Sequence, residues 1–230
     1  MSRGKKILRL ALKILLGLVA LVVLLVVVFL IFKDPIIKAV ARRAVREETG
    51  METVIGKIET HLGAGTVTLS GFRLINPPEF GGGVFVDIPE VHAELDSDAA
   101  ADGRVHFKLL RLNLAGAQVV KNKDGKTNLE YLDEHSRERA KLKKKKKKPH
   151  ENETVFDGID TFYFSLGKVG YTDLKNSRNN FEVEAGLKDE MAKDLKTEQE
   201  LNDWVTTKLF TVVVGELLKR YSKGGLKGLF

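Results

Sequence analysis

The sequence contains no cysteine among its 230 residues. This absence excludes a disulfide framework, zinc sites built on thiolates and catalysis by a thiol nucleophile. The Gly-x-Ser-x-Gly, His-Glu-x-x-His and Gly-x-x-x-x-Gly-Lys motifs of hydrolases, metalloproteases and nucleotide-binding proteins are also missing. We therefore expect no enzymatic activity and no cofactor, and we expect packing alone to stabilise the fold.

One long hydrophobic run lies near the amino terminus, and no second run approaches its length. Residues 14–32 contain no charged or polar side chain. A helix rises ~1.5 Å per residue, so this run reaches ~28 Å, about the thickness of a bilayer's hydrocarbon core. It is too long for a signal-peptide core and ends in bulky residues, so we predict an uncleaved signal anchor.

The charges around this run predict its orientation. Five basic residues and no acidic residue lie in residues 1–13, which favours a cytoplasmic amino terminus. Basic residues also follow the run and reduce this bias. We expect the chain after residue 32 to be translocated across the membrane.

The whole chain is basic, with a formal net charge of +7. For a translocated domain this charge indicates lipid headgroups, lipopolysaccharide or cell-wall polymer, and we expect no nucleic-acid partner. Seven of the eight residues 141–148 are lysine, which predicts a disordered linker over residues 141–153. Alternatively, these lysines neutralise phosphates of an apposed membrane or of lipopolysaccharide. The candidate anionic-surface contacts are Arg42, Arg43, Arg46, Lys141, Lys143, Lys144, Lys145, Lys146, Lys147 and Lys148.

A short basic helix is predicted directly after the anchor. Asp34 and Pro35 fit an N-cap and a first helical position, and Gly50 fits a helix stop. Apolar residues recur between them at helical spacing, interleaved with basic residues. Either the helix lies on lipid headgroups with its arginines facing phosphate, or its apolar stripe covers the edge of a sheet.

From residue 53 onward the hydrophobic period is two, which predicts a mostly antiparallel, twisted β-sheet. We predict a β-rich region over residues 33–140 and a second β segment with a carboxy-terminal helix over residues 154–230. The fold class is then a transmembrane helix followed by an α+β domain, whose sheet is flanked by a short amino-terminal and a longer carboxy-terminal helix. The predicted strands cover residues 53–60, 65–75, 84–96, 104–114, 117–122, 158–172 and 180–187, and the predicted later helices cover residues 129–142 and 197–222.

Gly71 in a strand interior predicts a bulge or a close backbone approach, and Asn76-Pro77-Pro78 predicts the end of that strand. Thr197-Glu-Gln-Glu200 matches a capping box at the start of the last helix. The residues of this helix predicted to face a sheet are Leu201, Trp204, Val205, Leu209, Val212, Leu217 and Leu218.

One hairpin can be placed in register if the chain turns through residues 97–103. One face of the pair is then charged and complementary and the other is apolar, as a one-sided sheet requires. His92, Glu94 and His106 share the charged face and resemble a metal-binding trio, but charge partners from the same register favour a solvated face without metal. The facing pairs are Asp96 with Arg104, Glu94 with His106, His92 with Lys108, Leu95 with Val105, Ala93 with Phe107 and Val91 with Leu109.

The segment Gly-Thr-Val-Thr-Leu-Ser-Gly-Phe-Arg-Leu-Ile-Asn-Pro-Pro-Glu-Phe, residues 65–80, resembles AsmA-like proteins of bacterial envelopes, including the related DUF748 group. The Asn-Pro-Pro-x-Phe element is its most specific part. Ile88-Pro-Glu-Val91, Asp124-Gly-Lys-Thr-Asn-Leu129, residues 109–116 and residues 159–173 extend the resemblance. It implies a single-pass inner-membrane protein whose periplasmic, elongated sheet has an apolar concave face and serves envelope or outer-membrane lipid homeostasis.

We therefore expect an apolar sheet face that shields or transfers acyl chains, with membrane phospholipid, lipopolysaccharide or other envelope proteins as partners. About seven strands at ~4.8 Å give a sheet only ~30 Å wide, too narrow to cross a periplasm alone. Two alternatives remain: an ordinary core covered by the carboxy-terminal helix, and a non-enzymatic, membrane-tethered scaffold or adaptor of an envelope complex. The candidate lipid-facing residues are Val67, Leu69, Ala93, Leu95, Val105, Phe107, Leu109, Phe162, Phe164 and Leu166.

Overall fold

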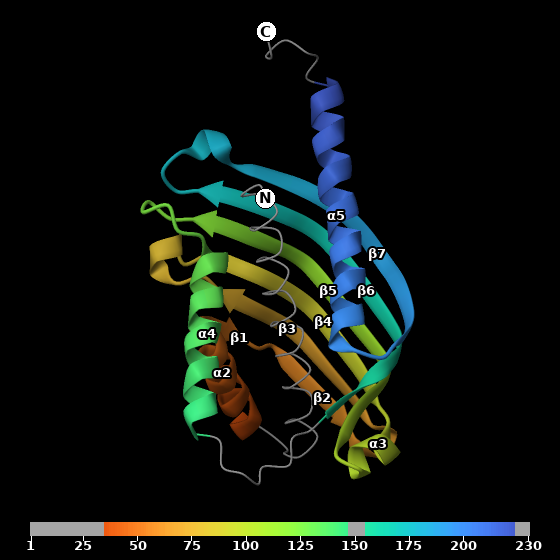
Figure 1. Ribbon diagram of the computed structural model, residues 1–230. Helices are drawn as coiled ribbons and strands as arrows, with labels where there is room; N and C mark the ends of the chain where they lie inside the picture. Colours follow the sequence, from red (N-terminus) through yellow and green to blue (C-terminus); the bar gives the residue numbers. More distant parts are fainter. Residues whose placement is uncertain (1–34, 147–154, 224–230) are drawn as a thin grey trace.

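The computed structural model describes residues 35–146 and 155–223, which form one α+β fold (Figure 1). The predicted tail, the predicted anchor at residues 14–32 and residues 147–153 of the predicted linker lie outside the described residues. Within the described ranges, no helix combines the length and the apolar character needed to cross a membrane.

Seven strands form a single sheet, which confirms the predicted mostly antiparallel architecture. Strand β2 pairs with β3 beside β1, and the other strands follow in the order β1-β3-β4-β5-β6-β7. Among the strands of the described residues only the β5–β6 pair is parallel, because the segment between these strands, which includes a helix, returns the chain to the same end of the sheet. The strands are β1 (Glu52–Val54), β2 (Lys57–His61), β3 (Thr66–Ile75), β4 (Val84–Leu95), β5 (Arg104–Lys121), β6 (Val155–Asp173) and β7 (Phe181–Leu195).

Three predicted strand boundaries are wrong. The strand predicted over residues 53–60 is split into β1 and β2, which share the outer side of β3. The two strands predicted over residues 104–122 are one strand, β5, and β7 continues through Leu195. Because β1 and β2 occupy one position, the sheet is six strands across, or ~24 Å wide at ~4.8 Å per spacing, narrower than the predicted ~30 Å.

Four helices accompany the sheet in the described part of the chain. They are α2 (Pro35–Thr49), α3 (Ser97–Ala101), α4 (Asn128–Lys146) and α5 (Glu198–Lys223). Helix α3 replaces the predicted plain turn, because the Asp96 carboxylate accepts hydrogen bonds from the backbone N–H groups of Asp98 and Ala99. Helix α4 includes residues 141–146, so predicted disorder is wrong for these residues; lysine is a good helix former.

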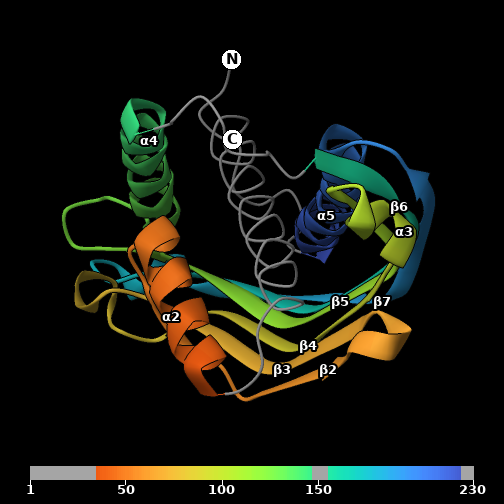
Figure 2. The ribbon, with the colours of Figure 1, turned by 90° about the horizontal axis from the view of Figure 1, so that it is seen from below.

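The helices lie on the concave side of the curved sheet (Figure 2). Helices α2 and α4 lie together at one side of it, and α5 lies at the other. The apolar stripe of α2, with Ala41 and Val45, belongs to the same buried core as the inner face of the sheet. This finding supports the interpretation in which the stripe covers the sheet instead of lying on lipid headgroups.

Candidate functional site

The apolar face of the sheet consists of rows of side chains that face one another across neighbouring strands. Directly facing residues of paired strands project to the same side of a sheet. A row across five strands covers four spacings, or ~19 Å. The rows are Val67, Ala93, Leu110, Phe162 and Ala192; Leu69, Val91, Leu112 and Phe164; and Leu95, Phe107, Ile159 and Leu195.

The structure buries nine of the ten predicted lipid-facing residues. Their side chains are at most 7% exposed, as for Val105, and Phe107, Phe162 and Phe164 are fully buried. The exception is Leu109, which is only half-buried and faces Glu94. The predicted inward position of Leu109 is therefore wrong, and Leu110 takes that position.

An irregularity in β5 explains this error in the predicted register. Leu95 faces Phe107, whereas Ala93 faces Leu110 and not Phe107 as predicted. The register shifts between Glu94 and Leu95, so the alternation of β5 changes by one residue near Lys108. The sequence carries a sign of this bulge, because the adjacent Leu109 and Leu110 break the strict period of two.

A second irregularity crosses the sheet beyond the rows, and we call its residues Gly71, Pro89, Ala115, Gly167 and Gly186 the crease. The flanking pairs place Gly71 opposite Pro89 and Ala115 opposite Gly167. Gly71 and Gly186 have φ angles of +67° and +62°, and a Cβ on Gly167 would lie 2.5 Å from the Ala115 carbonyl oxygen. Glycine permits such backbone conformations. A Cβ on Gly71 would lie 3.6 Å from Gly56 Cα, which agrees with the close backbone approach that was one of the two alternatives predicted there.

The Asn-Pro-Pro-x-Phe element holds the start of α4 against the ends of the strands. The Asn128 Nδ2 group donates hydrogen bonds to Asn76 Oδ1 at 2.8 Å and to the Gln118 carbonyl at 2.9 Å. Asn128 Oδ1 accepts the backbone N–H of Val120 at 3.0 Å. Two sequence segments that suggested the AsmA-like resemblance, residues 65–80 and 124–129, therefore meet in a buried polar contact.

Helix α5 covers the β6 end of the apolar rows. The ring of Trp204 stands edge-on to Phe162 and Phe164, at centroid distances of 5.6 and 6.4 Å. Leu201 and Val205 are buried beside it, which confirms the sheet-facing side predicted for this helix. The second row ends at a charge, because Glu190 of β7 faces Phe164 and pairs with Lys208 of α5.

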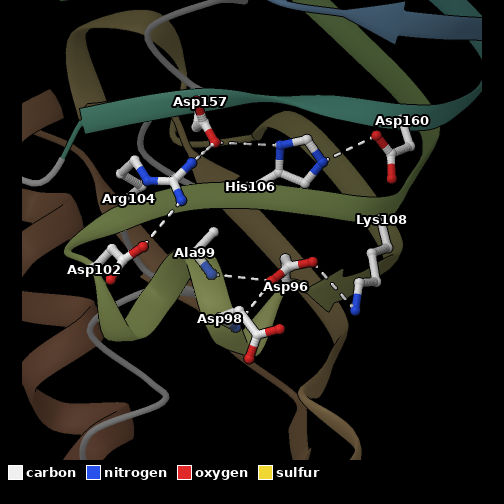
Figure 3. Close-up of polar contacts among 9 residues, drawn as sticks. All are labelled: Asp96, Asp98, Ala99, Asp102, Arg104, His106, Lys108, Asp157 and Asp160. Atoms are coloured by element: carbon white, nitrogen blue, oxygen red, sulfur yellow. Dashed lines mark hydrogen bonds and ion pairs between the residues drawn. The ribbon is translucent and has the colours of Figure 1, made fainter.

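The predicted trio of His92, Glu94 and His106 does not form. His106 Nε2 lies 2.9 Å from Asp160 Oδ1 and its Nδ1 lies 3.7 Å from Asp157 Oδ2 (Figure 3). His92 Nε2 lies 3.5 Å from Glu94 Oε1 and its Nδ1 lies 2.8 Å from Thr68 Oγ1, so two of the three side chains approach each other while His106 pairs elsewhere. The described residues contain no group of three His, Asp or Glu side chains placed to hold a metal.

Charges around α3 are paired within this corner of the sheet (Figure 3). Arg104 bridges Asp102 and Asp157, and Lys108 Nζ lies 3.3 Å from Asp96 Oδ2. The N–H of Ala99 and the ammonium of Lys108 hold the pKa of Asp96 below its usual range. This corner is a network of charge pairs, and the hypothesis of a solvated face fits it better than the hypothesis of a metal site.

A shallow hollow of about 230 Å³ lies over β4, β5 and β6, where small residues such as Gly116 and Gly170 line it. Lys168 at its rim lies 2.9 Å from Glu182 and 3.2 Å from Glu184, and both carboxylates raise the pKa of Lys168. Because this lysine is already neutralised, the hollow is a weaker candidate site than the apolar rows.

Comparison with known proteins gives one match. A sequence model of the AsmA family matches residues 3–197, so the chain belongs to the AsmA family and the predicted resemblance is confirmed. No curated protein and no solved structure matches the chain significantly. The matched range ends directly before α5 begins at Glu198.

Proposed function

We propose that this AsmA-family chain is a single-pass inner-membrane protein whose periplasmic sheet takes part in envelope lipid homeostasis by shielding or passing on acyl chains. The anchor of this proposal is the hydrophobic run of residues 14–32, with residues 1–13 in the cytoplasm. No catalytic step and no cofactor belong to it. Membrane phospholipid is the proposed ligand.

The observation that carries the proposal is the row of Val67, Ala93, Leu110, Phe162 and Ala192, which is apolar on all five strands. An acyl chain laid along such a row exchanges water for hydrocarbon at ~0.8 kcal/mol per methylene. The row offers no directional polar group, which suits a ligand without polar atoms along its length.

Access to the β6 end of the rows requires α5 to move, because Phe162 and Phe164 are fully buried there and Trp204 of α5 stands against both rings. Trp204, Leu201 and Val205 form the apolar contact, and the Glu190–Lys208 ion pair is the polar contact at the β7 edge. Further along α5, Leu209 is partly buried against the core, whereas Phe210 is 52% exposed. We propose that α5 occupies the place of the acyl chain when no lipid is bound.

A photo-crosslinking experiment tests this proposal on the full chain in its native membrane. A diazirine amino acid is placed at Ala192, which faces the rows, or at Lys193, the adjacent exposed residue on the opposite face of β7. We expect mass spectrometry to find phospholipid attached at position 192 and much less at position 193. Equal capture at both positions, or none at 192, would contradict the lipid role.

The second candidate function is a membrane-tethered scaffold or adaptor of an envelope complex. The observation that favours it is the closed core, in which nine of the predicted lipid-facing residues are at most 7% exposed. Purified full-length protein that carries no phospholipid, transfers none between liposomes and captures none at position 192 would favour this candidate over the first.

A further inference from the structure

Helices α2 and α4 pack side by side and run in opposite directions. Tyr131 Oη donates to the Gly50 carbonyl at 3.3 Å, His135 Nε2 lies 3.0 Å from the Glu47 carbonyl oxygen, and Arg139 Nη2 lies 2.9 Å from Glu47 Oε2. Tyr131, near the start of α4, thus contacts Gly50 just after the end of α2, whereas His135 and Arg139, further along α4, contact Glu47 within α2. Figure 1 shows α4 ending and α2 beginning at the same end of the molecule.

This geometry brings the lysine run to the beginning of α2. From Arg139, the last seven residues of α4 extend ~10 Å, and the same distance leads from Glu47 back to Val40 on α2. Residues 141–146 therefore lie at the end of the pair where α2 begins. Pro35, the first residue of α2, closely follows the hydrophobic run of residues 14–32.

The two ends of the helix pair differ in charge. Near Gly50, acidic residues neutralise the arginines, because Arg43 pairs with Glu47 and Arg46 pairs with Glu52, both at 2.9 Å. At the opposite end, residues 35–42 and 140–146 contain no acidic residue. Arg42 and Lys141 are exposed there, without an ion pair to any described residue.

Two large aliphatic side chains are exposed at the same end. Val40 is 49% exposed and Leu142 is 50% exposed. Leu142 lies between two lysines, and basic residues stand two positions before and after Val40. Aliphatic side chains among basic ones are the composition of a surface that binds anionic bilayers, where lysines attract phosphates and apolar groups enter the headgroup region.

We propose that this end of the α2–α4 pair, the basic platform, binds the anionic phospholipid surface from which the chain emerges. The basic platform comprises Val40 and Arg42 of α2 and residues 141–146 of α4. The proposal rests on the membrane location in the proposed function. It assigns the lysine run a defined position, against the headgroups beside the anchor, and it orients the apolar rows relative to the bilayer.

The absence of cysteine from the sequence permits a site-specific test. The full chain is reconstituted in nanodiscs of phosphatidylcholine with or without phosphatidylglycerol, and Leu142→Cys or Val40→Cys carries an environment-sensitive fluorophore. Ser177→Cys, exposed in the loop between β6 and β7, is the control position. We expect brighter, blue-shifted emission at positions 142 and 40 only with phosphatidylglycerol, and loss of this change at about 1 M salt, where the Debye length is ~3 Å.

Matched charge variants complete the test. Replacement of Lys141 and of residues 143–146 by glutamine should abolish the response at position 40. Inorganic phosphate should leave the response in place, because the bilayer and not a free anion is the ligand. The control variant loses the same charge at exposed sites elsewhere, by exchange to glutamine at Lys123, Lys175, Lys188, Lys193 and Lys196, and should respond normally.

Three results would overturn the basic platform: equal emission in both kinds of nanodisc, equal effects of the two charge variants, or a response to soluble polyglutamate in nanodiscs without phosphatidylglycerol. The last result would assign the surface to an acidic protein. Lipid capture at position 192 is measured in the same preparations. If capture persists while the fluorescence response is absent, the basic platform is refuted and the proposed lipid function is not.

Discussion

At the residue scale, buried polar side chains fix where strands end and helices begin. Asn128 is completely buried, and both the nitrogen and the oxygen of its side-chain amide form hydrogen bonds with residues at the ends of β3 and β5. Asp173 is 4% exposed and organises the loop after β6. Such groups stabilise the fold only while their hydrogen-bond partners remain bonded, since a buried polar atom without a hydrogen bond lowers the stability by ~1–3 kcal/mol.

We predict that Asn128→Ala lowers the free energy of unfolding by about 3 kcal/mol, because it orphans Asn76 Oδ1, the Gln118 carbonyl and the Val120 N–H. Chemical unfolding of the full chain in detergent micelles, followed by the fluorescence of Trp204, the single tryptophan, measures the change. Ser136→Ala, exposed on the same helix, should have almost no effect. A loss equal to that of the control would refute the buried-contact argument.

The carboxylate of Asp173 predicts a dependence of stability on acid. Hydrogen bonds from the Asn179 side chain and from the N–H groups of Lys175 and Asn176 hold its pKa below the usual range. A pKa lowered by folding contributes stability above the unfolded value of ~3.9, and this contribution is lost as the pH falls through the folded pKa.

We therefore expect unfolding to become easier below about pH 4, with a smaller acid effect in Asp173→Asn than in the wild type. Unfolding curves in micelles at neutral and acidic pH provide the comparison. Asp124→Asn removes an exposed loop carboxylate and should keep the acid effect of the wild type. An unchanged acid effect in Asp173→Asn would show that other carboxylates control it.

At the element scale, the crease decides the curvature of the sheet. Its positions come from different strands and align only after the strands pair. The sequence indicated a bend at Gly71, and also a strand end at Asn76-Pro77-Pro78, because these residues carry local backbone constraints. It did not indicate that Gly71 and Gly167, on strands separated by β4 and β5, come within one residue of the same line across the sheet.

We predict that Gly167→Ala destabilises the sheet by ~1–3 kcal/mol, because its Cβ would lie 2.5 Å from the Ala115 carbonyl oxygen, a backbone atom that cannot rotate away. Gly63→Ala is the matched control, since no heavy atom lies within 4 Å of its Cβ position. Urea unfolding of both variants in micelles checks the difference. Equal stability of the two variants would mean that β5 and β6 can move apart at the crease without lowering the free energy of unfolding.

At the scale of the whole molecule, α5 is the element that covers the β6 end of the apolar rows. It is also the element that the AsmA-family match does not include, because the match ends at residue 197. The sequence predicted its sheet-facing residues correctly from helical spacing, and the structure adds what they cover, namely Phe162 and Phe164 of β6.

We predict that Val205→Asp releases α5, because a carboxylate would replace a side chain that is 3% exposed. The emission of Trp204 should shift to the red, and lipid capture by a diazirine at position 192 should increase. Phe210→Asp, at a site that is 52% exposed, should change neither quantity. A fall in lipid capture together with loss of the sheet's hydrogen-exchange protection would show that α5 is a permanent part of the core.

The sequence by itself determined the elements whose signals are local. Period-two runs predicted the strands, a capping box predicted the start of α5, and the Asn-Pro-Pro-x-Phe element predicted the family. Uniform hydrophobicity predicts an anchor at residues 14–32, which lie outside the described residues. Signals of this kind act within a few residues along the chain. They therefore also identified most of the buried face, including Val67, Ala93 and Phe162.

The tertiary structure decided everything that depends on which segments pair. It set the register of β4 on β5 and thereby exchanged Leu109 for Leu110, because one bulge moves every later side chain to the other face. It separated His92 from His106, and it placed residues 141–146 of α4 at the end of the helix pair where α2 begins. These outcomes depend on contacts between residues far apart in the chain. The free energies of such contacts cannot be inferred from the pattern of neighbouring residues.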